Sequence, residues 1–220
     1  MNTQLLGNIT LNTSLGIYLI WFAPQILLNF KRKDTEGLSM LMIGILCIGY
    51  ISDLLYGFGR GMQWQYRLVT LIGLCGLAIQ HYQFGRYGLH RTTQKTTYLL
   101  LNVAYLLFLG YALFAIIGAY HSKGFYDLAG MLANACWFVY MLPQIIKNHH
   151  QGSTEGLSRI FVWLSIFLNL CDITSAWALG WDYPSKIGPA VTLLGNLCLL
   201  SQVIYYARRN KTAAGLATHS

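Results

Sequence analysis

Long apolar runs separated by short polar breaks dominate this chain. A bilayer core about 30 Å thick requires roughly 20 mostly apolar residues for each helix that crosses it. Seven runs meet this requirement: Thr13–Phe30, Leu38–Phe58, Gln65–Phe84, Tyr98–Tyr120, Tyr126–Ile146, Leu157–Gly180 and Ile187–Ala207. The pattern therefore predicts an all-α membrane protein with seven transmembrane helices.

The composition agrees with this pattern. Of the 220 residues, 55% are hydrophobic and only 10% are charged, and the mean hydropathy is +0.45. Soluble domains carry about 25% charged residues on average, so this composition argues against a soluble protein.

The positive charges predict the orientation in the membrane. If the N-terminus faces outside, the predicted inner segments hold eleven of the 15 Lys and Arg residues, namely Lys31, Arg32, Lys33, Arg86, Arg91, Lys95, Lys147, Arg159, Arg208, Arg209 and Lys211. The outer segments hold Arg60, Arg67, Lys123 and Lys186. Because cytoplasmic loops carry an excess of Lys and Arg, we expect the N-terminus outside and the C-terminus in the cytosol. The net charge of +8 then indicates topology, and no nucleic-acid partner is expected.

The chain contains an internal repeat. A shift of 119 residues superposes Pro24 and Gln25 on Pro143 and Gln144, Thr35–Ser39 on Thr154–Ser158, and Asp53 on Asp172. Further on, Val69–Gly73 matches Val191–Gly195 at a shift of 122, which predicts three inserted residues near Trp181. The repeat is three predicted helices long.

Three helices alone would leave the second copy inverted relative to the first, so one further crossing is needed between the copies. We predict a first repeat over residues 1–85, a linker with the fourth helix over 86–125, a second repeat over 126–208 and a cytosolic tail over 209–220. This arrangement is three plus one plus three, with both repeats parallel. Transporters built from parallel repeats place their substrate site between the halves.

Each repeat has a proline about two turns before the inner end of its first helix, where it predicts a kink. The carbonyls freed by Pro24 and Pro143 belong to Ile20 and Val139, and the amide side chain that follows each proline is a natural partner for them. The kink is either fixed or a hinge of a gate. The Thr-Glu-Gly-Leu-Ser segment that follows has serines suited to cap the next helix.

The two Pro-Gln pairs, each followed ten residues later by Thr-Glu-Gly-Leu-Ser, resemble the paired motifs of the PQ-loop family. That family includes cystinosin, lysosomal exporters of lysine and arginine, and the related SWEET sugar carriers. The resemblance implies alternating access in which the helices bend near their prolines. It assigns the gating hinge to Pro24, Gln25, Pro143 and Gln144.

Asp53 and Asp172 each lie in an otherwise apolar helix. A carboxylate at the bilayer centre costs about 2.5–3.5 kcal/mol on insertion scales, so such residues usually have a function. A carboxyl group in apolar surroundings can exchange a proton near working pH, and it can also bind a cationic solute. The alternative is a hydrated carboxylate near the outer interface, or one paired with Arg60 or Arg67.

The third helix of each repeat lines the site in SWEET-like relatives, and Asn196 fits this role by resemblance. Leu74 aligns with Asn196 at the shift of 122, so the two repeats do not offer a symmetric pair of amides. The further candidates for binding substrate are Asn169, Asn134, Gln80 and Trp137, although tryptophans also form interfacial belts. An asymmetric site with carboxylates favours a charged amino acid over a sugar.

We therefore expect a proton-coupled transporter of a cationic amino acid or cystine, in a bacterial inner membrane or a lysosomal membrane. The alternatives are a SWEET-like sugar uniporter and a sorting receptor resembling the KDEL receptors. No catalytic set or phosphate loop is present, so we expect no enzyme. The five cysteines lie inside predicted helices without a CxxC pair, so we expect no metal and no cofactor. The partners expected are a small solute, protons and the bilayer, and the oligomeric state stays open.

Overall fold

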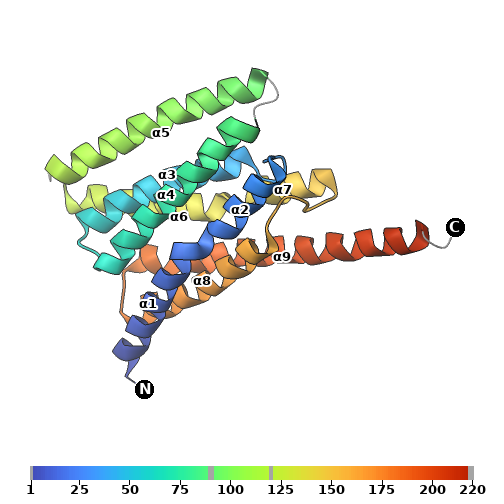
Figure 1. Cartoon of the computed structure of the whole chain (residues 1–220). Coiled ribbons are helices and arrows are strands. Elements are labelled where there is room, and N and C mark those ends of the chain that lie inside the picture. The colour runs from blue at the N-terminus through green and yellow to red at the C-terminus, as the bar shows by residue number, and fades with distance from the viewer. Residues whose placement is uncertain (1, 89–91, 119–120, 218–220) are drawn as a thin grey trace.

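The computed structural model describes residues 2–88, 92–118 and 121–217 (Figure 1). Within these ranges the regular structure is entirely helical. The helices are α1 (Thr3–Trp21), α2 (Ala23–Arg32), α3 (Met40–Gly59), α4 (Trp64–Tyr87), α5 (Thr92–Gly118), α6 (Lys123–Val139), α7 (Leu142–Gln151), α8 (Arg159–Ala178) and α9 (Tyr183–Ala217).

The described residues form seven spans long and apolar enough to cross a bilayer, which confirms the predicted number of transmembrane helices. Two of the spans are broken in the middle. Residues Thr3–Arg32 comprise α1 and α2, and residues Lys123–Gln151 comprise α6 and α7. Pro24 and Pro143 lie in the first turns of α2 and α7, so each predicted kink is a break at which a new helix starts.

The first helix is longer than predicted. It begins at Thr3 and not at Thr13, because Asn2 caps it by accepting a 3.1 Å hydrogen bond from the Gln4 amide. Its added turns also pack, since Leu11 is buried in a cluster with Ala176 and Trp181. The polar first residues are therefore part of the bundle.

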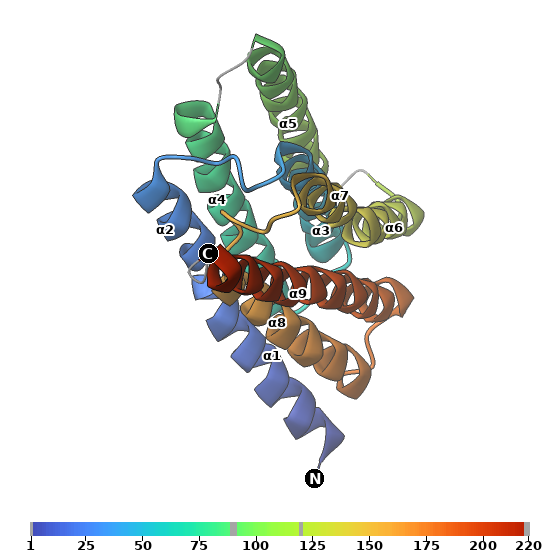
Figure 2. The same ribbon diagram turned by 90° about the vertical axis from the view of Figure 1, so that its right-hand side faces the viewer.

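Six spans form a closed ring around a central space. Within each repeat the first and second helices both pack on the third, so that α1 and α3 flank α4, and α6 and α8 flank α9. Between the repeats, the first helix of one packs against the second helix of the other, as α1·α8 and α3·α6. The linker helix α5 lies outside this ring against α3 (Figures 1 and 2). Its outer face is apolar and exposed, with Ile117 83% exposed, as expected for contact with lipid.

The structure corrects the predicted insertion near Trp181. The two repeats keep a shift of 119 throughout, because α4 begins at Trp64 and α9 at Tyr183. Gln83 bonds the Ile26 carbonyl at 2.9 Å, and Gln202 makes the equivalent bond to Ile145 at 3.0 Å. The shift of 122 is wrong because it rests on a short match between two apolar helices. The equivalent bonds of Gln83 and Gln202 fix the register of these helices at a shift of 119. The residue equivalent to Asn196 is therefore Leu77 and not Leu74.

The end of the bundle that holds residues 33–39 and 152–158 is called the motif end below. The first loop connects α2 to α3 and the second connects α7 to α8, and both run across this end (Figure 2). The serine caps predicted for the helices that follow are confirmed: Ser39 accepts from the Met42 amide and Ser158 from the Phe161 amide, both at 3.3 Å. The opposite end, where α1 begins, is called the N-terminal end.

Candidate functional site

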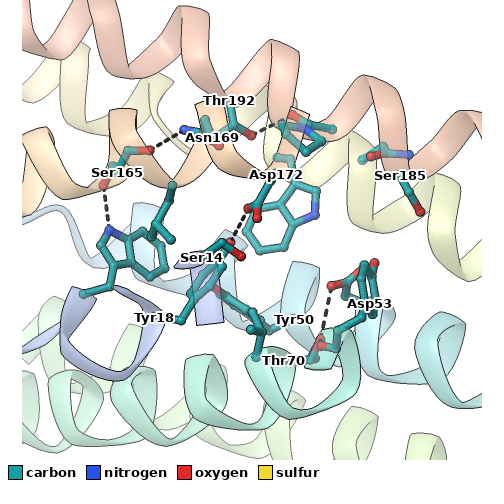
Figure 3. A pocket seen from close by; sticks show the side chains of 18 of the residues that line it. Ser14, Tyr18, Tyr50, Asp53, Thr70, Ser165, Asn169, Asp172, Ser185 and Thr192 are labelled. Atoms are coloured by element: carbon teal, nitrogen blue, oxygen red, sulfur yellow. Dashed lines mark hydrogen bonds between the residues drawn. The ribbon is translucent and has the colours of Figure 1, made fainter. Parts of the chain in front are cut away.

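A cavity lies between the two repeats at the centre of the ring (Figure 3). Its volume is about 100 Å³, well above the roughly 10–15 Å³ that a single water requires. Both repeats contribute to its wall: Leu11, Ser14, Tyr18, Trp21, Tyr50, Asp53, Tyr56, Tyr66, Val69 and Thr70 from the first, and Gly130, Asn134, Trp137, Tyr140, Ser165, Leu168, Asn169, Asp172, Trp181, Ser185, Gly188, Pro189, Thr192 and Asn196 from the second.

Asp172 reaches into this cavity from α8 and is bonded across the repeats. The Tyr18 hydroxyl of α1 donates to Asp172 Oδ2 at 3.0 Å. Ser14 lies beside this pair one turn earlier on α1 (Figure 3). Asp172 therefore joins the second helix of one repeat to the first helix of the other.

Asp53 reaches into the same cavity from α3 but is bonded within its own repeat (Figure 3). The hydroxyls of Tyr66 and Thr70, both on α4, donate to its two carboxylate oxygens, with Thr70 at 3.3 Å. These bonds hold the side chain in place without joining the repeats. The two equivalent carboxylates thus have different surroundings.

No basic side chain balances these carboxylates among the described residues that line the cavity. Arg60 is paired instead with Asp127, with Nε and Oδ1 2.8 Å apart. Arg67 lies over the ring of Phe58, 5.2 Å from its centroid. The alternative in which Arg60 or Arg67 neutralises the carboxylates is therefore wrong. Its described lining residues supply two acidic groups and no fixed cation.

Four of the five further candidates line this cavity. Trp137 packs edge-on against Tyr50, with ring centroids 4.9 Å apart. Asn169 and Asn196 donate to carbonyls one turn back on their own helices, at 2.8 Å and 3.1 Å. Asn134 also lies in the wall. The oxygen of Asn196 is buried without a hydrogen-bond partner within the described part of the chain.

The structure does not bring Gln80 to the cavity. It lies ten residues after Thr70 on α4, about 15 Å farther toward the motif end at 1.5 Å per residue. Its side chain is only 1% exposed, and neither amide atom has a partner among the described residues. The α4 residue equivalent to Gln202 is Gln83 and not Gln80.

The motif glutamines close the motif end by bonding the opposite repeat. Gln25 donates to the Gly156 carbonyl at 2.9 Å and accepts from the Ser158 amide at 2.8 Å. Gln144 donates to the Gly37 carbonyl at 2.9 Å and accepts from the Ser39 amide at 2.7 Å. We call these four bonds the glutamine clamp.

The clamp corrects the expectation that these glutamines bond the carbonyls of Ile20 and Val139. Their amides are used between the repeats and for one bond each along their own helices, to Asn29 and Asn148, both at 2.8 Å. Those asparagines in turn donate to the α4 and α9 glutamines at 3.0 Å. The clamp is therefore tied to all three helices of each repeat.

An aromatic layer separates the cavity from the clamp. Trp21, at the end of α1, donates to the Ser165 hydroxyl at 2.7 Å and stacks on Phe161 of α8, with centroids 5.3 Å apart. Phe22 packs against Trp21, and Tyr140 of the second repeat is buried in the same core cluster. Between the cavity and the motif end lie first this aromatic layer and then the glutamine clamp.

Several cavity residues were not predicted. Tyr18 and Tyr66, which bond the carboxylates, carry no charge and look like ordinary membrane aromatics in the sequence. Thr70 is equally inconspicuous. Pro189, inside α9, could have indicated this part of the cavity from the sequence, because a proline within an apolar run marks an irregular helix near a binding site. In the described part of the chain, no three His, Cys, Asp or Glu side chains are grouped as metal ligands would be.

Comparisons with known proteins agree with this architecture. A family model described as the PQ loop repeat matches residues 6–66 and 125–185, two segments that are again 119 residues apart. The vacuolar histidine transporter YPQ3 of Saccharomyces cerevisiae is 29% identical over 92 residues, which cover 42% of this chain and 31% of that protein. The vacuolar lysine transporter YPQ1 of the same yeast is 30% identical over 83 residues, which cover 36% and 27%. These matches span about a third of each relative or less.

A solved eukaryotic SWEET transporter has the same fold, with a TM-score of 0.71. The superposition covers 94% of this chain and 100% of that chain at 13% identity, so the likeness concerns the fold alone. Together with the seven apolar spans, these findings identify a multi-pass integral membrane protein.

Proposed function

We propose, from the premise that this chain belongs to the PQ-loop repeat family, that it is an alternating-access transporter of a cationic amino acid, coupled to protons. The observation that carries this proposal is the pair Asp53 and Asp172 in one cavity without a basic side chain among its lining residues. A solute with a positive charge supplies what this cavity lacks.

Electrostatics favours this class of solute. Two carboxylates removed from water are costly, and in a medium of low dielectric each gains strongly from a nearby positive charge. A sugar brings hydroxyl groups but no charge, so it leaves both carboxylates without a counter-ion. An amino acid with a cationic side chain keeps a net positive charge, because its α-ammonium and α-carboxylate cancel, so its side chain can supply the counter-ion that Asp53 lacks.

The remaining wall supplies the other contacts that an amino acid requires. The free oxygen of Asn196 is an acceptor for a further N–H group of the solute. Trp137 and Tyr50 offer ring faces, on which ammonium and imidazolium groups bind favourably. The names of the two yeast relatives, a histidine and a lysine transporter, support the same choice.

Proton coupling is assigned to Asp172. Its bond with Tyr18 joins α1 to α8, so gain or loss of a proton there changes a contact between the repeats. Asp53 bonds only within its own repeat and is assigned to the solute. This division gives the two equivalent carboxylates separate roles.

Alternating access requires the motif end to open. The helix breaks at Pro24 and Pro143 lie directly before the clamp glutamines, so a change of angle at each break would separate Gln25 and Gln144 from the opposite loops. We propose that these breaks are the hinges. The vacuolar names of the yeast relatives support a lysosome-like membrane, and no enzymatic role is proposed.

The direct test is uptake by the purified full-length chain in proteoliposomes, with and without an inside-alkaline pH gradient. Labelled lysine, arginine, histidine, cystine and glucose are supplied separately. The proposal expects accumulation of a cationic amino acid driven by the gradient. Equilibration of glucose regardless of pH would identify a sugar uniporter instead, and binding of a solute without flux would identify a receptor.

A further inference from the structure

A second hollow lies at the motif end, between α7 and the last part of α9. His149 and Gly152 of α7 and its cap line one side, and Tyr205, Tyr206 and Arg209 of α9 line the other. Its volume is about 590 Å³, within the range of roughly 300–1,000 Å³ typical of ligand sites. We call this hollow the α7/α9 groove.

The first repeat fills the equivalent place with its own side chain. Lys33, equivalent to Gly152, lies with its ammonium 3.6 Å from the ring centroid of Phe30 and 5.4 Å from that of Tyr87. Both positions have a left-handed backbone, with φ of 53° at Lys33 and 59° at Gly152. Because Gly152 has no side chain, the second repeat leaves open a space that the first repeat closes.

The charged side chain that lines the groove is the cation Arg209. A Cβ atom placed on Gly152 would lie 4.0 Å from Nη1 of Arg209, so the guanidinium borders the space that the lysine fills in the other repeat. Arg209 makes no ion pair with any carboxylate in the described part of the chain. None of the described lining residues is Asp or Glu. An oxyanion with several acceptor oxygens matches the guanidinium donors.

The flanks of the groove are apolar and exposed. On α7, Leu142 and Ile146 are 48% and 53% exposed and precede His149 along one face. On α9, Leu194 and Leu197 are 64% and 45% exposed and lie on the bilayer side of the groove. A ligand with an anionic head and hydrocarbon chains can therefore place the head against Arg209 and the chains along these two faces.

We propose that the α7/α9 groove binds the headgroup of an anionic phospholipid, with Arg209 contacting the phosphate. Basic pockets between transmembrane helices near the cytoplasmic surface suit such headgroups. The groove also includes Gln202, which accepts from Asn148 at 3.0 Å, and Asn148 accepts from the clamp residue Gln144 at 2.8 Å. A bound lipid would hold α7 against α9 beside the clamp and so favour the closed motif end.

The test measures how lipids raise the melting temperature of the purified full-length chain in neutral detergent. Dioctanoyl phosphatidylglycerol, dioctanoyl phosphatidylcholine and inorganic phosphate are titrated separately. The proposal expects phosphatidylglycerol to act at about tenfold lower concentration than phosphatidylcholine, because the choline ammonium competes with Arg209 for the phosphate charge, and inorganic phosphate to have no effect because it has no hydrocarbon chains. An equal effect of inorganic phosphate would assign the groove to a soluble anion and overturn the lipid.

Two variants distinguish binding of the lipid in this groove from a general attraction of anionic lipid to positive charge on the protein. Arg209→Gln should weaken the phosphatidylglycerol effect about tenfold. Arg86→Gln, which removes an exposed charge from the motif end of the other repeat, should not. Equal losses in both would overturn the proposal.

Gly152→Lys adds charge but fills the groove as Lys33 does in the first repeat. The proposal expects it to lose the preference for phosphatidylglycerol in spite of the added charge. A preference equal to that of the parent would show that the hollow is not the site. Lys33 adopts the same backbone conformation, so the substituted chain has a precedent for folding.

Discussion

At the motif end Gln25 and Gln144 make the same pair of bonds in opposite directions, whereas in the cavity the equally equivalent Asp53 and Asp172 bond to different partners. The backbone explains the first result. Each glutamine binds an N–H and a C=O of the opposite loop, and backbone groups are the same whatever side chains the two repeats carry.

Side chains explain the second result. The constant shift of 119 pairs Tyr50 with Asn169, and it pairs the buried Leu77, which does not line the cavity, with Asn196, which does. It also pairs Thr70, which bonds Asp53, with Pro189, which has no donor. The symmetry of the motif end therefore follows from backbone groups that both repeats share, and the asymmetry of the cavity follows from side chains that differ between them.

The largest expected effect tests whether Asp53 and Asp172 have different roles. Asp172→Asn should abolish gradient-driven uptake, because an amide keeps the shape but carries neither the charge nor the proton. An asparagine cannot gain or release a proton, so the rate with the inside-alkaline gradient should fall to the rate without it. Asp53→Asn should lower uptake less and leave the dependence on the gradient.

Initial rates at several pH values in proteoliposomes provide the measurement. Tyr18→Phe is the control that removes the bond between the repeats but keeps the carboxylate. Equal losses in Asp53→Asn and Asp172→Asn, with the same pH profile, would contradict the assignment of coupling to the second repeat.

The next effect tests the symmetry of the clamp. Gln25→Leu and Gln144→Leu should each destabilise the closed structure by roughly 2–4 kcal/mol, because each leaves a backbone N–H and a C=O without partners. The two losses should be equal within error. Melting of the purified chain measures them.

Gln80→Leu is the matched control for the clamp. It is the same change at a residue that is just as buried but has no hydrogen-bond partner among the described residues, so it should not lower the melting temperature. A loss in this control as large as in the clamp variants would mean that the clamp bonds contribute little.

A smaller effect is expected where one repeat is made to copy the other. Asn196→Leu gives the second repeat the residue that the first has at position 77. It should raise the KM for a cationic amino acid about three- to tenfold, since one hydrogen bond contributes roughly 0.5–1.5 kcal/mol. The melting temperature should stay unchanged or rise. An unchanged KM would remove Asn196 from the binding site.

The smallest effect concerns the paired helix caps. Ser39→Ala and Ser158→Ala each remove one side-chain bond to a helix N-terminus, at a cost of about 1 kcal/mol. Each should lower the melting temperature by roughly 2–4 °C, because a chain of this size shifts by that amount per kcal/mol. Two unequal shifts would show that the symmetry of the motif end does not extend to its energetics.

Much of the fold was predictable because it depends on local chemistry. Apolar runs of bilayer length, prolines that cannot continue a helix and serines that cap one each act within a few residues. Asp53 and Asp172 could be singled out for the same reason, since burial of Asp in an apolar run is costly wherever its partners lie. The helical start at Thr3 was missed because polar residues interrupt residues 3–12, so that Leu11, which packs with Ala176 and Trp181, does not belong to a continuous apolar run.

The sequence alone determined the number of spans, the repeat, the breaks at Pro24 and Pro143, and the two acidic positions. Only the tertiary structure decided that Gln25 and Gln144 bond the opposite repeat, that Gln80 is remote from the cavity, and that Gln83 and Leu77 are the true equivalents of Gln202 and Asn196. The physical reason is that these facts depend on contacts between residues 57 to 154 positions apart, the longest being the bond from Tyr18 to Asp172. The register and rotation of packed helices set such contacts, and neither is written in a local pattern of residues.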